Sequence, residues 1–244
     1  VVLSNNDGCA VARSNEVKSL GVKMGMPWFK MKDLARQHGI QAYSSNYALY
    51  GDMSNRVTSI LRDYSPDLEV YSIDESFLRI ETVAHLYGGA IPMGQQMRHR
   101  IKQWTGLPVC VGIGPTKTLA KLANYAAKKW KQTGGVLDLA DPMRREKLMK
   151  IVSVGEVWGI GPRLSRQLAD LGIPHVEALR RADAAMLRTR FSVALERTIR
   201  ELRIDGGGIV IGALAGIVCL LAVTKLKEIA RTFVITRGGD GALT

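Results

Sequence analysis

Apolar residues recur at intervals of three or four in four segments, and this spacing predicts four helices. Two are expected at residues 14–20 and 27–38, where Gly21 and Gly39 can take the left-handed conformation that ends a helix. A longer helix at residues 47–64 should cover one face of a sheet. In the fourth, residues 116–131, the apolar stripe consists of Leu119, Leu122, Ala123, Ala126 and Trp130.

Shorter apolar runs predict strands at residues 1–3, 40–43, 68–73, 77–80 and 107–114. Asp74 and Glu75 lie between the third and fourth of these strands. Neighbouring residues of a flat strand face opposite ways, so both carboxylates can reach one ion only if the chain turns there. Held together at the tip of a sheet, they could bind Mg²⁺ for phosphoryl or nucleotidyl transfer.

The helix at residues 116–131 is a candidate phosphate site. It follows a strand that ends in glycines, a position where α/β proteins often bind phosphates. Opposite its apolar stripe we expect a face formed by Lys117, Lys121, Asn124, Lys128 and Lys131. The alternative is a lysine face that is only solvated.

Residues 157–168 have the form of a helix-hairpin-helix. A helix near residues 144–152 precedes a turn containing Gly159 and Gly161, and Pro162 suits the first position of a second helix. The glycines would let a duplex backbone approach, and main-chain N–H groups could bind a phosphate, with Arg163 and Arg166 adding charge. Such contacts carry no base sequence. A purely structural helical hairpin is the alternative.

Composition narrows the class of protein. The 244 residues carry a net charge of +12, of which the segment from Ile204 contributes +1, and a basic surface of this size suits phosphate backbones. Cys9, Cys110 and Cys219 are too few and too scattered for a disulfide framework or a zinc site, which favours a reducing cytosol. The N-terminus has no apolar stretch long enough for a secretory signal.

From Val1 to about Arg203 the chain resembles the UmuC group of the Y-family translesion DNA polymerases. The resemblance is specific because many motifs match in order. They are residues 2–9 (VLSNNDGC), 21–25 (GVKMG), 44–47 (SSNY), 52–57 (DMSNRV), 71–75 (YSIDE), 116–124 (TKTLAKLAN), 157–161 (VWGIG) and 195–198 (LERT).

The resemblance implies an α+β fold with a polymerase-like palm sheet, fingers and a helical thumb that contains the helix-hairpin-helix. On this basis the fingers, with a stub of the first palm strand, are expected at residues 1–45, the palm at 46–138 and the thumb at 139–203. The little finger has no counterpart. Residues 204–244 are expected to be an unrelated, apolar, glycine-rich tail, translated from a rearranged reading frame and separable from the polymerase-like part.

The resemblance also implies roles for single residues. Asp74 would bridge two Mg²⁺ ions, and Glu75 would bind the ion that activates the primer 3′-hydroxyl. Lys121 would grip the incoming triphosphate, with Lys18 near the same phosphates. The DNA contacts are expected to be Lys117, Lys128, Gly159, Gly161, Arg163 and Arg166. The implied partners are a DNA primer–template, a deoxynucleoside triphosphate, UmuD-type subunits and the RecA filament; a sliding-clamp contact and a membrane are not expected.

Val1 follows the family's first strand, which carries another metal-binding Asp and a steric gate against ribonucleotides. With two carboxylates left for two Mg²⁺ ions, weak metal binding and little DNA synthesis are expected. Two alternatives stay open. One is a non-enzymatic module that binds DNA or partner subunits, and the other is a palm-type nucleotidyl cyclase, against which the helix-hairpin-helix argues.

Overall fold

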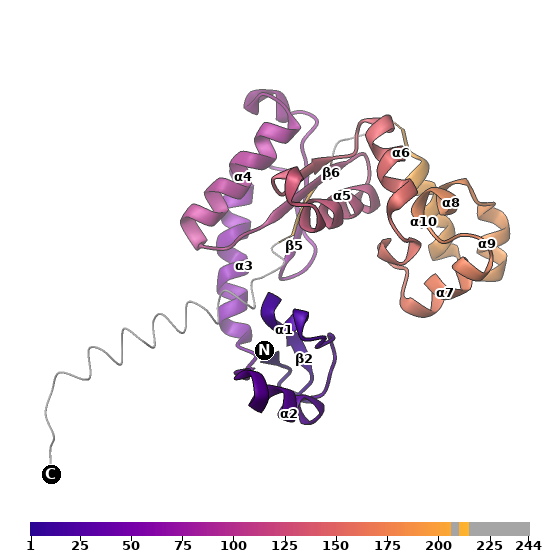
Figure 1. Ribbon diagram of the computed structural model, residues 1–244. Helices are drawn as coiled ribbons and strands as arrows, with labels where there is room; N and C mark the ends of the chain where they lie inside the picture. The colour runs from indigo at the N-terminus through magenta and orange to yellow at the C-terminus, as the bar shows by residue number, and fades with distance from the viewer. Residues whose placement is uncertain (206–209, 215–244) are drawn as a thin grey trace, which may run out of the picture. The chain divides into compact units, whose positions relative to one another are not determined.

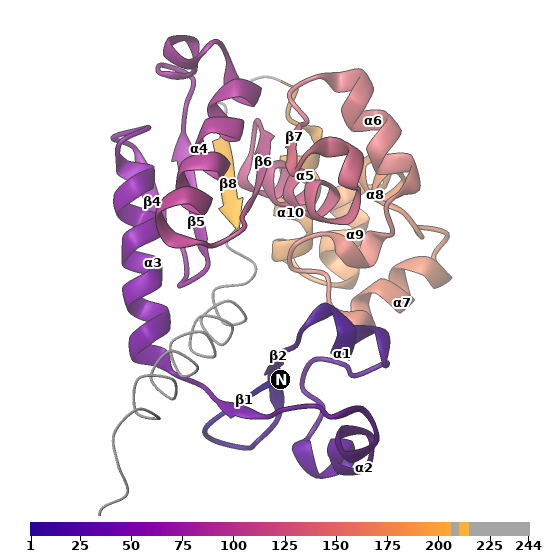
Figure 2. The ribbon, with the colours of Figure 1, turned by 60° about the vertical axis from the view of Figure 1, so that its left-hand side comes forward.

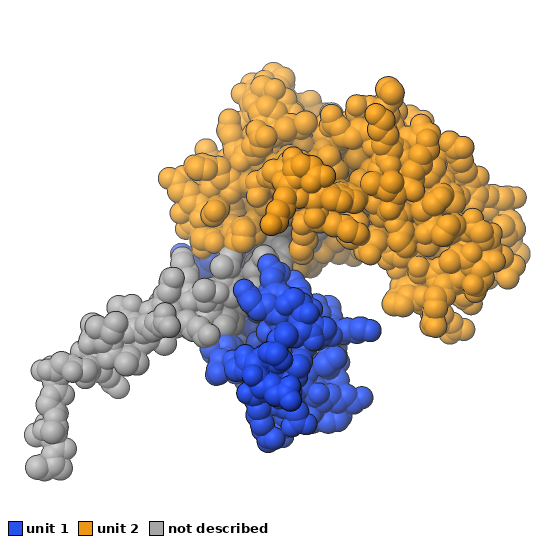
Figure 3. Space-filling view, in the orientation of Figure 1, with its two compact units in different colours: residues 1–56, 217–244 blue, residues 57–216 orange. Residues whose placement is uncertain are grey.

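The computed structural model describes residues 1–205 and 210–214 (Figure 1). The chain divides into two compact units, and the boundary falls within helix α3 (Tyr47–Arg62). Unit 1 contains residues 1–56 and unit 2 the described residues from Val57 onward, as coloured in Figure 3.

Unit 1 is built on a three-stranded sheet of order β2-β1-β3. Strand β1 (Val2–Leu3) pairs antiparallel with β2 (Ala10–Ala12) and parallel with β3 (Tyr43–Ser44). Helix α1 (Asn15–Ser19) begins at Ser14, whose side chain accepts a hydrogen bond from the Val17 N–H, and α2 (Trp28–His38) ends at Gly39, where φ is 64°. The predicted helices are confirmed. The strand expected at residues 40–43 begins later, at Tyr43.

Unit 2 contains a five-stranded sheet of order β4-β5-β8-β6-β7 (Figure 2). Its strands are β4 (Leu68–Val70), β5 (Glu75–Arg79), β6 (Cys110–Gly114), β7 (Val136–Asp138) and β8 (Val210–Leu214). Strand β8 is antiparallel to both neighbours: Gly212 lies opposite Phe77 of β5 on one side and Gly112 of β6 on the other.

Two helices cover opposite faces of this sheet. A Cβ at Gly112 would lie under 3.0 Å from backbone atoms of α5 (Lys117–Lys129), so this face of β6 lies directly against that helix. The next residue back, Val111, is on the other face, where its Cγ1 would be 3.1 Å from a Cβ at Gly94 of α4 (Ala90–Thr105). Glycine is therefore required at position 112 by the close approach of α5 to the sheet.

A helical region follows β7 and shares one apolar core with α5. Several of its helices begin at a side-chain cap, such as Asp141 for α6 and Ser192 for α10. The helices are α6 (Pro142–Ile151), α7 (Pro162–Asp170), α8 (Val176–Arg181), α9 (Ala184–Arg190) and α10 (Val193–Arg203), and the short 3₁₀ turns of unit 2 are η1 (Ala84–Tyr87), η2 (Lys131–Thr133) and η3 (Val154–Glu156).

A buried ion pair also lies in this helical region. Arg180 donates to the buried carboxylate of Glu177 and so holds the pKa of that carboxyl below its usual range.

The position of β8 corrects the prediction that everything after Arg203 is separable. Val210–Leu214 is a central strand, and Ile211 is fully buried. The side chain of Arg145, itself buried, pairs with Asp205 and donates to the Ile204 carbonyl, so the chain leaving α10 is also bound to α6. The rest of the predicted tail, residues 206–209 and 215–244, lies outside the described residues. None of the described helices combines the length and apolar composition needed to cross a membrane.

Candidate nucleotide and DNA-binding site

The predicted carboxylate pair lies at the tip of the β4–β5 hairpin. Main-chain N–H groups of Tyr71 and Ser72 donate to the Glu75 carbonyl at 3.0 Å, so the chain turns between the strands. Asp74 lies in this turn, where the Ser72 hydroxyl donates to its Oδ1 at 2.8 Å, and Glu75 is the first residue of β5. The turn that the carboxylates need in order to face one ion is therefore present.

Helix α5 brings two lysines to this hairpin. The Lys121 Nζ is 2.6 Å from the Glu75 Oε1, in a pair whose side chains are only 15% and 19% exposed. Lys117 pairs with Glu69 of β4. The triphosphate-binding lysine and the metal-binding carboxylate of the prediction thus neutralise each other in this structure.

The predicted lysine face of α5 is only partly exposed. Asn124 is 1% exposed, and its amide donates to the carbonyls of Cys110 in β6 and Gly212 in β8. Helix α5 lies on the sheet at Ala120 and Asn124, and its apolar stripe packs against the helical region. Lys128 is exposed near the end of α5, and Lys131 lies beyond it in η2.

An aromatic cluster beside the carboxylates was not predicted from the sequence. The ring of Trp158, from the helix-hairpin-helix, lies 5.2 Å from Tyr71 and 6.0 Å from Phe77 between centroids. Lys117 Nζ lies 5.4 Å from the Phe77 ring centroid, and Lys121 Nζ is equally far from that of Trp158. The only sign of this cluster in the sequence is Trp158 itself, which lies within the Val157–Gly161 motif. Its aromatic partners are remote in the sequence and could not be identified from it.

The helix-hairpin-helix follows the prediction closely. Helix α7 begins at Pro162, as expected, and Gly161 precedes it without a side-chain cap. The 3₁₀ turn η3 lies between α6 and the loop, which the sequence did not indicate. Arg163 and Arg166 are both exposed on α7, and within the described part of the chain neither forms an ion pair.

The two glycines of this loop differ in backbone conformation. Gly159 has a φ of 88°, which disfavours other residues. Gly161 has an ordinary φ of −78°, and a Cβ added there would meet nothing within 4 Å. Since folding of the described residues does not require glycine at position 161, its small size is available for the approach of another molecule.

Lys18 lies on α1 of unit 1, and Asp74, Glu75 and Lys121 belong to unit 2. Its proposed place near the same phosphates stays a prediction.

The carboxylates fit a magnesium ion that arrives with a nucleotide better than a bare ion. Across residues 1–205 and 210–214, no three His, Cys, Asp or Glu side chains lie close enough together to hold a metal. Mg²⁺ commonly uses one or two carboxylates together with substrate phosphates and water. Asp74 and Glu75 can supply two such carboxylates once Lys121 no longer pairs with Glu75.

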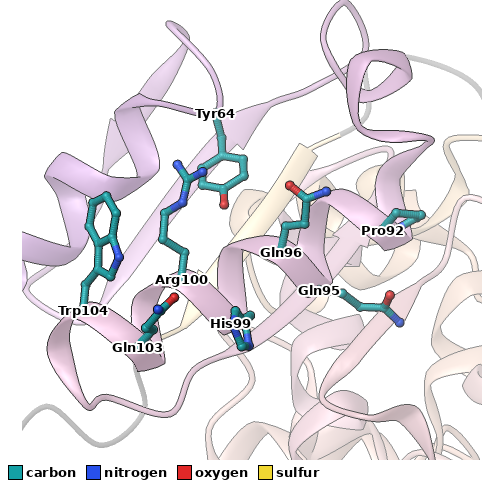
Figure 4. Close-up of a pocket in the computed structure, with 8 residues that line it drawn as sticks. All are labelled: Tyr64, Pro92, Gln95, Gln96, His99, Arg100, Gln103 and Trp104. Carbon is teal, nitrogen blue, oxygen red and sulfur yellow. The ribbon is translucent and has the colours of Figure 1, made fainter.

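A separate hollow of about 670 Å³ lies on the outer side of α4 (Figure 4). The Arg100 guanidinium lies between the rings of Tyr64 and Trp104, at 4.9 and 5.5 Å from their centroids, and 3.5 Å from Asp63. Burial raises the pKa of Tyr64. Among the described residues that line this hollow, none carries a carboxylate and none belongs to the β4–β5 hairpin or the helix-hairpin-helix, so they do not contribute to the metal site.

The chain is similar to proteins of known sequence and structure. ImpB of Salmonella typhimurium is 48% identical over 204 residues, which are 83% of this chain and 48% of ImpB, and UmuC of the same species matches with the same values. The crystal structure of DinB from Sulfolobus solfataricus superposes with a TM-score of 0.68 at 26% identity, covering 83% of this chain and 58% of DinB.

These matches confirm the predicted α+β class and the resemblance to the UmuC group of Y-family polymerases. The chain spans about half the length of the curated relatives it matches. The model of the impB/mucB/samB family matches residues 1–125, just over half of the chain. The chain therefore belongs to the impB/mucB/samB family.

Proposed function

We propose that this chain is the fingers, palm and thumb part of a translesion DNA polymerase, which adds nucleotides opposite damaged template bases. The observation that supports this most is the meeting of three features at one hairpin. Carboxylates Asp74 and Glu75, the phosphate-binding candidate Lys121 and the helix-hairpin-helix residue Trp158 all lie there. Such a combination suits a metal-bound triphosphate held beside a duplex.

Asp74 and Glu75 would hold Mg²⁺ together with the triphosphate of the incoming nucleotide. When bound, the ion lowers the pKa of the primer 3′-hydroxyl and offsets charge on the phosphates. Ser72 keeps Asp74 oriented by donating to one carboxylate oxygen. Lys121 has to exchange its Glu75 partner for a phosphate oxygen, so a single movement frees the carboxylate and delivers a cation. Lys18 is proposed to reach the same phosphates from α1.

The duplex would be held through its backbone. The uncapped N-terminus of α7 offers main-chain N–H groups beside the open positions of Gly159 and Gly161, and Arg163 and Arg166 add positive charge. Lys117 and Lys128 are proposed as further phosphate contacts from α5. UmuD-type subunits and a RecA filament as partners, in a cytosolic SOS response to DNA damage, are the finer part of the proposal and rest on the resemblance to the UmuC group.

Primer extension on undamaged and abasic templates tests the proposal, together with binding of a non-reacting α,β-imido deoxynucleotide. We expect Mg²⁺-dependent nucleotide binding and weak extension, both lost in Asp74→Asn. One observation favours the alternative of a DNA-binding module without catalysis: the described residues place only two carboxylates at the hairpin tip. Duplex binding with no Mg²⁺-dependent nucleotide binding would support that alternative, and binding of neither ligand would overturn the proposal.

Replacing Lys121 should change metal and nucleotide binding in opposite directions. In Lys121→Met, Glu75 loses its competing cation, so Mn²⁺ used as a paramagnetic probe should bind several-fold more tightly without nucleotide. Affinity for the imido nucleotide should fall about tenfold, because a hydrogen bond to a charged group contributes roughly 1.5–3 kcal/mol. Lys129→Met, at another exposed position of the same helix, is the control and should alter neither affinity. A fall in both affinities would contradict the exchange of partners.

Reversing the charge of the helix-hairpin-helix should weaken DNA binding without regard to sequence. Arg163→Glu combined with Arg166→Glu should lower duplex affinity about tenfold at low salt and make its dependence on salt shallower, because fewer phosphates are neutralised. Lys147→Glu with Arg197→Glu is a control of equal charge on exposed positions of α6 and α10. Fluorescence anisotropy with two duplexes of unrelated sequence measures the affinity and its dependence on salt for each double variant. Equal losses in the two double variants would mean that only net charge matters.

A further inference from the structure

Trp158 connects the two halves of the proposed site. It directly precedes Gly159 in the helix-hairpin-helix loop, while its ring packs edge-on to Tyr71, at an interplanar angle of 81°, and against Phe77 of the carboxylate-bearing hairpin. A displacement of this loop therefore has to move a side chain that contacts the carboxylate hairpin.

The indole also favours the ion pair that blocks the site. The Lys121 Nζ lies 5.4 Å from the ring centroid of Trp158, within the range of a cation–π interaction, while 2.6 Å from Glu75. The pair is largely buried beside this ring, and low exposure to water strengthens the attraction between the two charges. With Trp158 in place, a metal-bound triphosphate has to compete for both Glu75 and Lys121.

The loop next to Trp158 is the proposed phosphate site. Positions 159 and 161 are both open, and the N-terminus of α7 has no side-chain cap. A phosphate bound to these main-chain N–H groups would draw the loop toward the duplex, and Trp158, adjacent to Gly159 in the chain, would move with it.

From these contacts we infer that Trp158 is a positioning residue, through which duplex binding at the helix-hairpin-helix releases Lys121 from Glu75 and so favours binding of the metal-bound nucleotide. This inference rests on the proposed function. By thermodynamic linkage, nucleotide must then raise duplex affinity by the same factor by which duplex raises nucleotide affinity.

The test is a titration of the full 244-residue chain with the Mg²⁺-bound imido nucleotide, with and without a primer–template duplex. In the unaltered chain, duplex should tighten nucleotide binding about fivefold or more. In Trp158→Ala, the free chain should bind nucleotide more tightly than the unaltered free chain, and duplex should add less than about twofold. Trp104→Ala removes an exposed tryptophan of α4 and should keep the full coupling.

Two further variants keep the test decisive if Trp158→Ala folds poorly. Tyr71→Ala breaks the same contact from the hairpin side, at a half-exposed residue, and should also remove the coupling. Trp158→Phe retains an aromatic ring and should keep most of the coupling that Trp158→Ala loses. Full coupling in both Trp158→Ala and Tyr71→Ala would overturn the inference.

A readout without ligands separates this inference from the proposed function. The tryptophan emission that Trp158→Phe removes should shift in Lys121→Met, since the cation beside the ring is lost. An unchanged emission would contradict the contact. If the unaltered chain binds neither nucleotide nor duplex, the proposed function fails and this inference with it; if it binds both without coupling, only this inference fails.

Discussion

A chain ended after Arg203 is expected to lose the cooperative unfolding of unit 2, whereas a chain ended after Leu214 keeps it. Removing β8 leaves the facing edges of β5 and β6 without main-chain partners and removes the fully buried Ile211. Deletion of one buried isoleucine side chain alone costs about 2–5 kcal/mol. With a net cost of about 1 kcal/mol or more for each lost main-chain hydrogen bond, the total reaches the 5–15 kcal/mol that typically stabilises a whole domain.

Urea denaturation followed by near-ultraviolet circular dichroism measures this effect on both shortened chains. Equal midpoints would show that residues 204–214 are dispensable, as the sequence alone suggested. Gly212→Val tests the same strand in the full chain. A Cβ at this position would be 3.3 Å from Phe77 Cε1 and 3.5 Å from Ala120 Cβ, so valine crowds α5 against the sheet and should lower the midpoint.

Gly112→Ala is expected to lower the free energy of unfolding by about 3 kcal/mol or more, at the upper end of the cost of overpacking. The added methyl group meets the backbone of Ala120 and Asn124 in α5, and a backbone cannot turn away as a flexible side chain can. The helix would have to move off the sheet, which also weakens the bonds from Asn124 to Cys110 and Gly212.

Gly161→Ala is the matched control for Gly112→Ala in the same unit. Its φ suits any residue and its Cβ would meet no described atom, so stability should change by less than about 0.5 kcal/mol. If the denaturation midpoint of Gly112→Ala differed from that of the unaltered chain as little as the midpoint of Gly161→Ala does, α5 would not pack on β6 as described.

The sequence by itself determined the elements that depend on near neighbours. Apolar spacing, caps and glycines within a few residues predict helices α1, α2, α3 and α5, the start of α7 at Pro162 and the turn that contains Asp74. Glu75, expected beside Asp74 between two strands, is the first residue of β5. The motifs also placed the chain correctly beside the UmuC group, because many short matches in order need no knowledge of the fold.

Only the tertiary structure decided what depends on partners remote in the chain. Residues 210–214 look like the start of an apolar tail, and their role as a central strand depends on β5 and β6, about a hundred residues earlier. Asn124, on the same side of α5 as the lysines, is buried against the sheet, because Gly112 and Gly212 leave room for the helix there, while Lys128 stays exposed. The contacts of Trp158 with Tyr71 and Lys121 arise in the same way. The spacing of residues along the chain predicts which side chains share one face of a helix or strand. Which element packs against that face depends on the rest of the fold.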